Sequence, residues 1–245
     1  MKDNFSRQAK DYAKFRPTYP TNLIQSLISL TNKQDNAWDC GTGNGQIATI
    51  LSEYFVKVYA TDISKNQIKN APKKSNIIYK LESAETSSLP DTSVDLIVVA
   101  QAIHWFDFDK FYSQVKRVLA DEGTIAVLGY GLLTINPDLD KVIRHFYTEI
   151  VGNYWDEERK YVDEQYKTIP FPFKEIQLPP FKIKYQWKFD QLIGYINTWS
   201  AVQHYIRNNN ENPTRSIARE LEKNWGEKDR VEVTFNLLTR VGKLS

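Results

Sequence analysis

The sequence predicts an α/β protein built on a mostly parallel β-sheet, and three observations support this fold class. Short apolar runs alternate with amphipathic stretches from about residue 35 to residue 130, which is the pattern of β-α-β units. The first apolar run ends in a glycine-rich turn, 39–45 (DCGTGNG). Asp62 closes the second apolar run, about 20 residues after the turn, where a doubly wound fold places an acid that binds a ribose.

Each element of this fold has its own signal in the sequence. Ile47, Ile50 and Leu51 have helical spacing after the glycine turn, and Ser64 with Gln67 has the spacing of a capping box for a helix that ends near Pro72. Apolar residues in 108–118 predict the helix that precedes the fifth strand. The expected strands are 37–40, 56–60, 77–79, 95–100, 124–128, 182–189 and 231–238.

Composition narrows the classes of partner. The chain has 245 residues, enough for a single domain, and its 32 Lys and Arg nearly balance its 30 Asp and Glu, so we expect no nucleic-acid partner. Cys40 is the only cysteine, so the sequence predicts neither an internal disulfide nor a cysteine metal site, and we assign no metal. Without a signal peptide or an apolar run of about 20 residues, we expect a cytoplasmic protein with no membrane partner.

The glycine turn is the most informative segment. Glycines permit positive φ angles and let backbone N–H groups approach a ligand directly. The spacing is D-x-G-x-G-x-G, with Gln46 where a dinucleotide-binding turn has its third glycine or alanine, which argues against a pyrophosphate cofactor. The Asp39 carboxylate would repel phosphate but could receive a cationic amino group. A turn that serves only tight strand-to-helix packing is the alternative interpretation.

These residues, together with several others, resemble the class I S-adenosylmethionine-dependent methyltransferases, specifically the branch of trans-aconitate methyltransferase-like proteins with a type 11 methyltransferase domain. The resemblance covers nearly the whole chain. The further segments that carry it are 12–20 (YAKFRPTYP), 61–64 (TDIS), 83–85 (SAE) with 89–90 (LP), 101–106 (QAIHWF), 117–119 (RVL) and 198–200 (TWS).

The resemblance implies a fold and a set of cofactor residues. The fold is a Rossmann-like, seven-stranded, mostly parallel sheet with an antiparallel last strand, helices on both faces and a helical cover. One methyltransferase domain would comprise an N-terminal strap and helix (1–34), a cofactor-binding core (35–130), the cover (131–180) and C-terminal strands and helices that complete the sheet (181–245). The residues implied to bind S-adenosylmethionine are Tyr12, Arg16, Asp39, Gly41, Gly43, Gly45, Asp62, Ile63, Ser83, Ala84, Glu85 and Gln101. Many relatives have an aspartate where this chain has Ser83.

The expected reaction is methyl transfer to a small-molecule acceptor, in EC class 2.1.1.-. His104 and Trp105 follow the fourth strand at the edge where open α/β sheets bind ligands, so we assign them, with Arg16, to the reaction. His104 could position the acceptor or move a proton, and Arg16 could pair with a carboxylate. The remaining candidates are aromatic walls and anion partners: Tyr154, Trp155, Trp199, Tyr205, Arg144, Arg159 and Arg207.

Three other functions remain open on the sequence alone. A nicotinamide-dependent oxidoreductase is disfavoured by Gln46 and by the lack of a recognisable tyrosine–lysine pair. A methyltransferase-like binding module without activity would keep the same glycines. Methylation of nucleic-acid base amines commonly uses an Asn/Asp-Pro-Pro-aromatic motif after the fourth strand, and this chain has 102–106 (AIHWF) there. The acceptor atom and the oligomeric state are not predicted.

Overall fold

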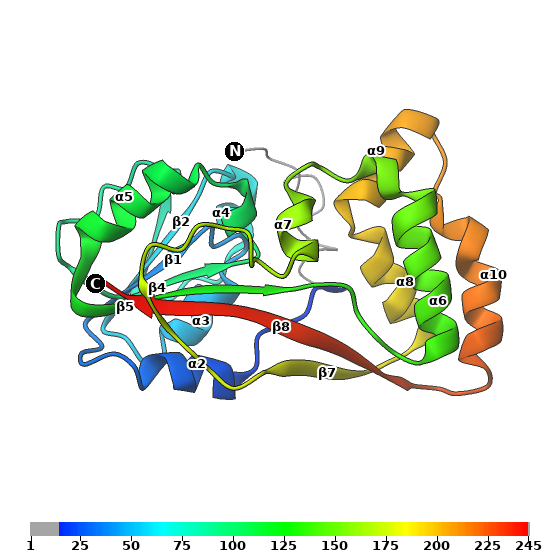
Figure 1. Cartoon of the computed structure of the whole chain (residues 1–245), viewed down its shortest axis with the longest axis horizontal. Helices are drawn as coiled ribbons and strands as arrows, with labels where there is room; N and C mark the ends of the chain where they lie inside the picture. Colours follow the sequence, from blue (N-terminus) through cyan, green and yellow to red (C-terminus); the bar gives the residue numbers. More distant parts are fainter. Residues whose placement is uncertain (1–14, 245) are drawn as a thin grey trace.

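A computed structural model describes residues 15–244 and has an α/β architecture with one mixed sheet (Figure 1). The strands are β1 (Asn36–Cys40), β2 (Lys57–Asp62), β3 (Ile77–Leu81), β4 (Val94–Ala100), β5 (Leu119–Tyr130), β6 (Lys174–Ile176), β7 (Lys182–Trp187) and β8 (Val231–Lys243). Their order is β3-β2-β1-β4-β5-β8-β6, and β7 also pairs with β8. The five strands β1 to β5 pair in parallel, and β8 is antiparallel to β5, β6 and β7. The expected Rossmann-like sheet with an antiparallel last strand is confirmed.

The strand count differs from the expected seven. The additional strand is β6, three residues long, which pairs with the far end of β8 from Lys174 opposite Lys243 to Ile176 opposite Val241. A three-residue strand is too short to show an alternating pattern, and its partner lies far along the sequence. Only the tertiary pairing reveals it.

Helices cover both faces of the sheet because its central strand is apolar on both sides. In β4, Leu96 and Val98 belong to the core that packs on α3 (Gln46–Leu51), while Ile97 and Val99 belong to the core that packs on α5 (Phe108–Val118). All four side chains are fully buried. A continuous apolar run therefore predicts a strand buried between two helical layers.

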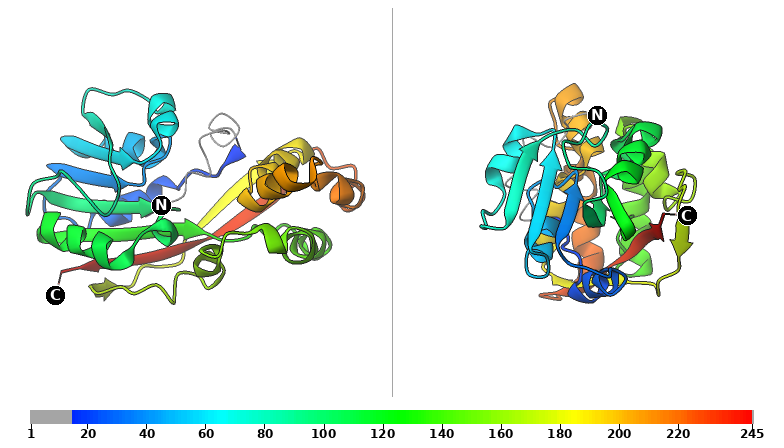
Figure 2. Two further views of the ribbon diagram at one scale, coloured as in Figure 1. Left: turned by 90° about the horizontal axis from the view of Figure 1, so that it is seen from above. Right: turned by 90° about the vertical axis from the view of Figure 1, so that its left-hand side faces the viewer.

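Apart from α2 (Thr21–Ile28) and α4 (Lys65–Asn70), the remaining helices form a group beside one end of the sheet (Figure 1). Helices α2 and α4 belong to the sheet half. The group at the end consists of α6 (Pro137–His145), a π-helical turn η3 (Phe146–Ile150), η4 (Gly152–Tyr154), α7 (Arg159–Asp163), α8 (Phe189–Asn197), α9 (Ser200–Asn209) and α10 (Thr214–Trp225). The cover expected from 131–180 thus also takes α8 to α10 from the C-terminal part of the chain. Figure 2 shows β8 running from the sheet to this group.

A 3₁₀ turn, η2 (Ile103–Trp105), follows β4 directly. Within residues 15–244, no helix is long and apolar enough to cross a membrane.

Candidate active site

The glycine turn after β1 has the backbone that the sequence predicts. Gly41, Gly43 and Gly45 have φ angles of 72°, 54° and 79°. A Cβ on Gly41 would lie 2.6 Å from Cβ of Ala102, and one on Gly45 would lie 2.5 Å from the hydroxyl of Tyr79, whereas a Cβ on Gly43 would meet nothing within 4 Å. Gly41 and Gly45 are therefore required for close packing, and Gly43 leaves the loop open on the side of a cavity that it lines.

Asp62 joins the two loops at the carboxyl ends of β1 and β2. Its Oδ2 accepts a hydrogen bond of 2.8 Å from N–H of Gly43, and its Oδ1 accepts one of 2.8 Å from N–H of Ser64. Ser64 in turn caps α4, accepting from N–H of Gln67 at 3.3 Å, so the predicted N-cap is confirmed. A carboxylate has about four lone-pair sites, so the two oxygens of Asp62 can hold both loops at once.

Asp39 is an acid enclosed in the interior, with 1% of its surface exposed. Its Oδ2 accepts hydrogen bonds from the hydroxyl of Thr42 at 2.5 Å and from N–H of Ala48 at 2.8 Å. Burial raises the pKa of Asp39 to about 7, the charge of Asp62 adds to the rise, and the two hydrogen bonds oppose it. The carboxyl is therefore balanced between its neutral and charged forms near neutral pH, and a cation bound beside it would favour the charged form.

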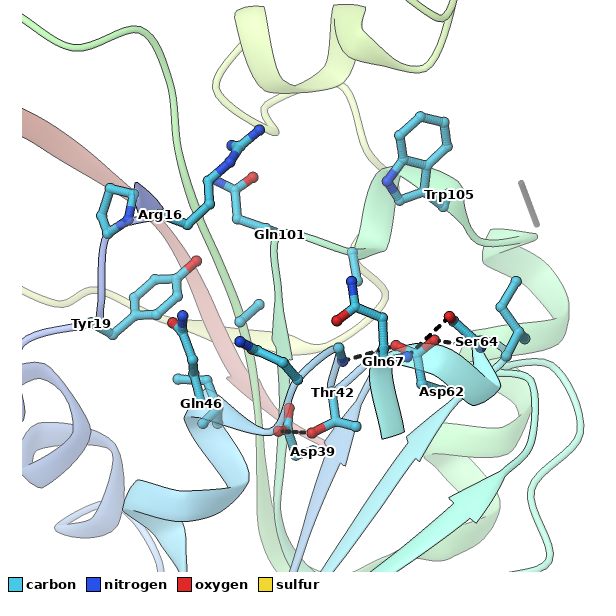
Figure 3. Close-up of a pocket in the computed structure, with 18 of the residues that line it drawn as sticks. Arg16, Tyr19, Asp39, Thr42, Gln46, Asp62, Ser64, Gln67, Gln101 and Trp105 are labelled. Atoms are coloured by element: carbon cyan, nitrogen blue, oxygen red, sulfur yellow. Dashed lines mark hydrogen bonds between the residues drawn. The ribbon is translucent and has the colours of Figure 1, made fainter. Parts of the chain in front are cut away.

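A cavity lies at the carboxyl ends of β1, β2 and β4 (Figure 3). Figure 3 shows Arg16, Gln101 and Trp105 on one side of it and Asp39 and Asp62 on the other. The predicted residues that line it are Arg16, Asp39, Gly41, Gly43, Asp62, Ile63, Gln101 and Trp105. This is the crevice where open α/β sheets bind ligands.

The remaining predicted cofactor residues are not in the described lining. Ala84 is buried, Ser83 shares a hydrogen bond of 3.0 Å with the hydroxyl of Thr86, and Glu85 accepts from N–H of Asp107 at 3.1 Å. Gly45 packs against the ring of Tyr79 and not against the cavity. Tyr12 lies outside the described residues. The assignment of 83–85 to an adenine therefore stays a prediction.

Sequence reasoning missed several lining residues, among them Gln67 and Tyr130. Gln67 has the signature of a helix cap, and the sequence does not show that its side chain faces the cavity. Tyr130 ends β5, and its carbonyl accepts from Nε2 of Gln101 at 2.9 Å. Gln101 has a left-handed backbone with φ 53°, which costs on the order of 1–3 kcal/mol and is typical of functional sites.

A second cavity adjoins the first and shares Arg16, Gln101 and Trp105 with it. The residues that line only the second cavity are His104, Trp155, Asp156, Arg159 and Ser200. Of the anion partners considered from the sequence, Arg159 is therefore at the site. Arg144 instead lines an open surface groove along α6, and Trp199 is buried in the core.

His104 lies at the wall of this second cavity and is 7% exposed. Its Nδ1 is 3.2 Å from the hydroxyl of Tyr166, whose ring lies where a side chain on Gly129 would be, since a Cβ there would come within 2.6 Å. Burial, and next the charge of Arg159, lower the pKa of His104 to about 3. A base this weak is poorly matched to proton transfer at neutral pH.

Comparison with known proteins decides the family. The chain is 36% identical over 241 residues to a Dictyostelium discoideum protein described as a methyltransferase, covering 95% of this chain and 92% of that one. The chain belongs to the class I S-adenosylmethionine-dependent methyltransferases. The model of the methyltransferase domain matches residues 38–127 of this methyltransferase. A solved structure of a type II methyltransferase from Anaeromyxobacter dehalogenans is 36% identical, has a TM-score of 0.86 and covers 94% of this chain and 98% of its own.

The residues of the first cavity fit the methyl donor of this family. Main chain at Gly43 is open to the cavity, the carboxylate of Asp62 lines it and is a group that accepts from ribose hydroxyls, and buried Asp39 can receive a cationic amino group. Gln46 also lines the cavity, at the position where a dinucleotide-binding turn has a small residue. Of these residues, Asp39 and Gln46 favour an adenosine with a cationic amino-acid tail over a dinucleotide.

Proposed function

We propose that this methyltransferase transfers the methyl group of S-adenosylmethionine to a small-molecule acceptor, with carboxylates as the favoured class. The single observation that carries the proposal is the pair of adjoining cavities with a shared wall at Arg16, Gln101 and Trp105. One cavity has the residues for the donor, and the other has arginines for an anionic acceptor. The trans-aconitate methyltransferase-like branch belongs to this proposal.

The bound donor supplies a sulfonium methyl group that is already activated by its positive charge. The protein's own contribution is to orient the acceptor and to exclude water, which can lower a barrier by roughly 7–11 kcal/mol. A carboxylate acceptor is ionised at neutral pH and has no proton to remove, so the reaction needs no strong base. The low pKa of His104 agrees with this chemistry, in which His104 acts by position.

Two measurements test the proposal. Calorimetric titration with S-adenosylmethionine, its demethylated product and NAD should show binding of the first two only. Incubation with methyl-labelled donor and a panel of carboxylic acids, phenols, thiols and amines should label carboxylic acids. Absence of affinity for both donor and product would refute the function, and labelling confined to neutral amines or to protein would refute the acceptor class.

A further inference from the structure

The second cavity is assembled from segments that are far apart in the sequence. Arg16 precedes the sheet, Gln101 and His104 follow β4, Arg159 begins α7, and Ser200 begins α9. In Figure 1, α7 lies between the sheet and the group of α6, α8, α9 and α10. The cavity therefore lies where the two halves of the molecule meet.

Arg159 is held in place from several directions. Its Nε donates a hydrogen bond of 2.7 Å to the hydroxyl of Tyr147 and lies 3.4 Å from Oδ1 of Asp163. Its guanidinium carbon lies 4.7 Å from the ring centre of Trp155 and 5.4 Å from that of Tyr147. Tyr147 donates its own proton to Oδ1 of Asp163 at 2.5 Å. The guanidinium plane is thus fixed by one hydrogen bond, one ion pair and two aromatic rings.

The two terminal amino groups of Arg159 are not used by these contacts. Within residues 15–244, the hydrogen bond and the ion pair of the Arg159 side chain both involve Nε, and neither terminal amino group donates a hydrogen bond. The side chain is 20% exposed and lines the second cavity. A fixed guanidinium with two unused donors is the geometry that binds a carboxylate through two parallel hydrogen bonds.

The charges of the described lining favour an anion. Arg16 and Arg159 contribute two positive charges, and Asp156 contributes one negative charge. Oδ2 of Asp156 lies 3.9 Å from Nδ1 of His204, and His204 itself is not in the lining. Asp163 pairs with the Nε side of Arg159 and is not in the lining either. His104 is uncharged at neutral pH because its pKa is about 3.

Arg159 lines only the second cavity, whereas Arg16, Gln101 and Trp105 line both. The reacting atom of an acceptor must lie where the two cavities meet, because the donor occupies the first. A carboxylate bound by two hydrogen bonds also loses nucleophilicity. The group held by Arg159 is therefore a poor methyl acceptor, and a second group of the same molecule must react.

We propose that Arg159 anchors a carboxylate of the acceptor that is not the group methylated, so that the site selects acceptors with a carboxylate at one end and the reacting group at the other. The inference rests on the proposed function and adds an anchoring residue and a bifunctional acceptor. Glutarate and terephthalate carry two carboxylates, while butyrate and glutaramide lack one or both.

The first experiment measures binding without turnover. The full chain is saturated with S-adenosylhomocysteine and titrated calorimetrically with the four probes. We expect a dicarboxylate to bind and Arg159→Gln to weaken it by about 10- to 100-fold. Arg144→Gln, on the surface groove of α6, is the matched control and should bind like the wild type. Affinity for S-adenosylhomocysteine should be the same in all three proteins.

The outcomes separate this inference from the proposed function. Failure to bind S-adenosylhomocysteine would refute the function itself. Normal binding of that ligand, with either no affinity for any dicarboxylate or equal affinity in wild type and Arg159→Gln, would refute only the anchor. Equal binding of glutaramide and glutarate would refute it too.

A second variant and a kinetic measurement test the same proposal independently of the binding titration. Tyr147→Phe keeps the ring but removes the hydroxyl that accepts from Nε of Arg159, so it should weaken dicarboxylate binding by several-fold even if Arg159→Gln fails to fold. In the methyl-transfer assay, Arg159→Gln should raise KM for a dicarboxylate far more than it lowers kcat. Methylation of butyrate as efficient as that of glutarate would contradict a bifunctional acceptor.

Discussion

At the scale of single residues, the buried carboxyl of Asp39 lowers the stability of the fold when it is charged, and it is also the group assigned to bind a cation. Its carboxyl is buried and accepts two hydrogen bonds, and burial raises its pKa from 3.8 to about 7. The folded state therefore holds this proton more tightly than the unfolded state does. The resulting stability is fully present below pH 3.8 and is lost as the pH rises through about 7. A cationic ligand beside Asp39 would recover part of this loss.

The substitution Asp39→Asn tests this assignment. The amide oxygen can still accept from Thr42 and Ala48, but the group cannot become charged. We expect the free energy of unfolding of the wild type to fall between pH 5 and pH 8 by about 2 kcal/mol more than that of the variant. Chemical denaturation across this pH range measures the difference. At pH 8 the variant should be the more stable protein and yet bind S-adenosylmethionine more weakly; parallel pH profiles would contradict the assignment.

Gly41 and Gly43 differ in what surrounds them, although both have positive φ. In Gly41→Ala the new Cβ would lie 2.6 Å from Cβ of Ala102, so we expect a loss of about 2–4 kcal/mol in the free energy of unfolding. Gly43→Ala has only the backbone strain, about 1–2 kcal/mol, but its methyl group would enter the space of the first cavity. Its main effect should be about tenfold weaker binding of S-adenosylhomocysteine.

Denaturation and calorimetry on both variants check this contrast. Gly131→Ala serves as the control, because a Cβ there meets nothing within 4 Å and its φ is not positive. If Gly43→Ala proved the more destabilising substitution, the placement of the two glycines relative to the core and the cavity would be wrong.

At the scale of elements, the sheet half could be predicted well because its signals are local. The apolar run of β4, the glycine turn and the capping residue Ser64 each determine their own surroundings. The second cavity could not be predicted in this way. Arg159 and Arg144 are equal candidates for an anion partner on the sequence, and only the tertiary structure, in which α7 packs on η2, puts Arg159 at the site and leaves Arg144 on the surface.

The contact between α8 and Phe15, which precedes the sheet, could not be predicted from local sequence signals either. Gly194 stands inside α8, where glycine disfavours a helix by about 1 kcal/mol relative to alanine. A Cβ on Gly194 would lie 2.5 Å from Cε1 of Phe15, so the glycine makes room for that ring. The next residue, Arg16, donates from Nη2 to the carbonyl of Thr198 at 3.0 Å and lines both cavities.

Gly194→Ala should therefore separate stability from binding. Better helix propensity should leave the free energy of unfolding unchanged or slightly higher. Displacement of Phe15 should shift Arg16 and weaken S-adenosylhomocysteine binding several-fold. Calorimetry and denaturation on the same preparation measure the two effects. Unchanged affinity would show that the position of Phe15 has no influence on the site.

At the scale of the whole molecule, the site depends on how the two halves are joined. β8 pairs with β5 and β6 in the sheet and with β7 toward the helical group, so one long strand holds both halves (Figures 1 and 2). The first cavity belongs mainly to the sheet half, and the second takes Trp155, Asp156 and Arg159 from the cover. Donor and acceptor should therefore act on different parts of the protein.

Hydrogen exchange can resolve this division. S-adenosylhomocysteine at 100 times its Kd should add about 2.7 kcal/mol of stability and raise Tm by about 5–10 °C. It should slow exchange in 41–44, 62–64 and 100–102, which line the first cavity. A dicarboxylate added next should slow exchange in 155–163, and this second effect should be absent in Arg159→Gln. Uniform protection of all these segments by S-adenosylhomocysteine alone would mean that the two halves respond as one unit and that the cavities are not independent.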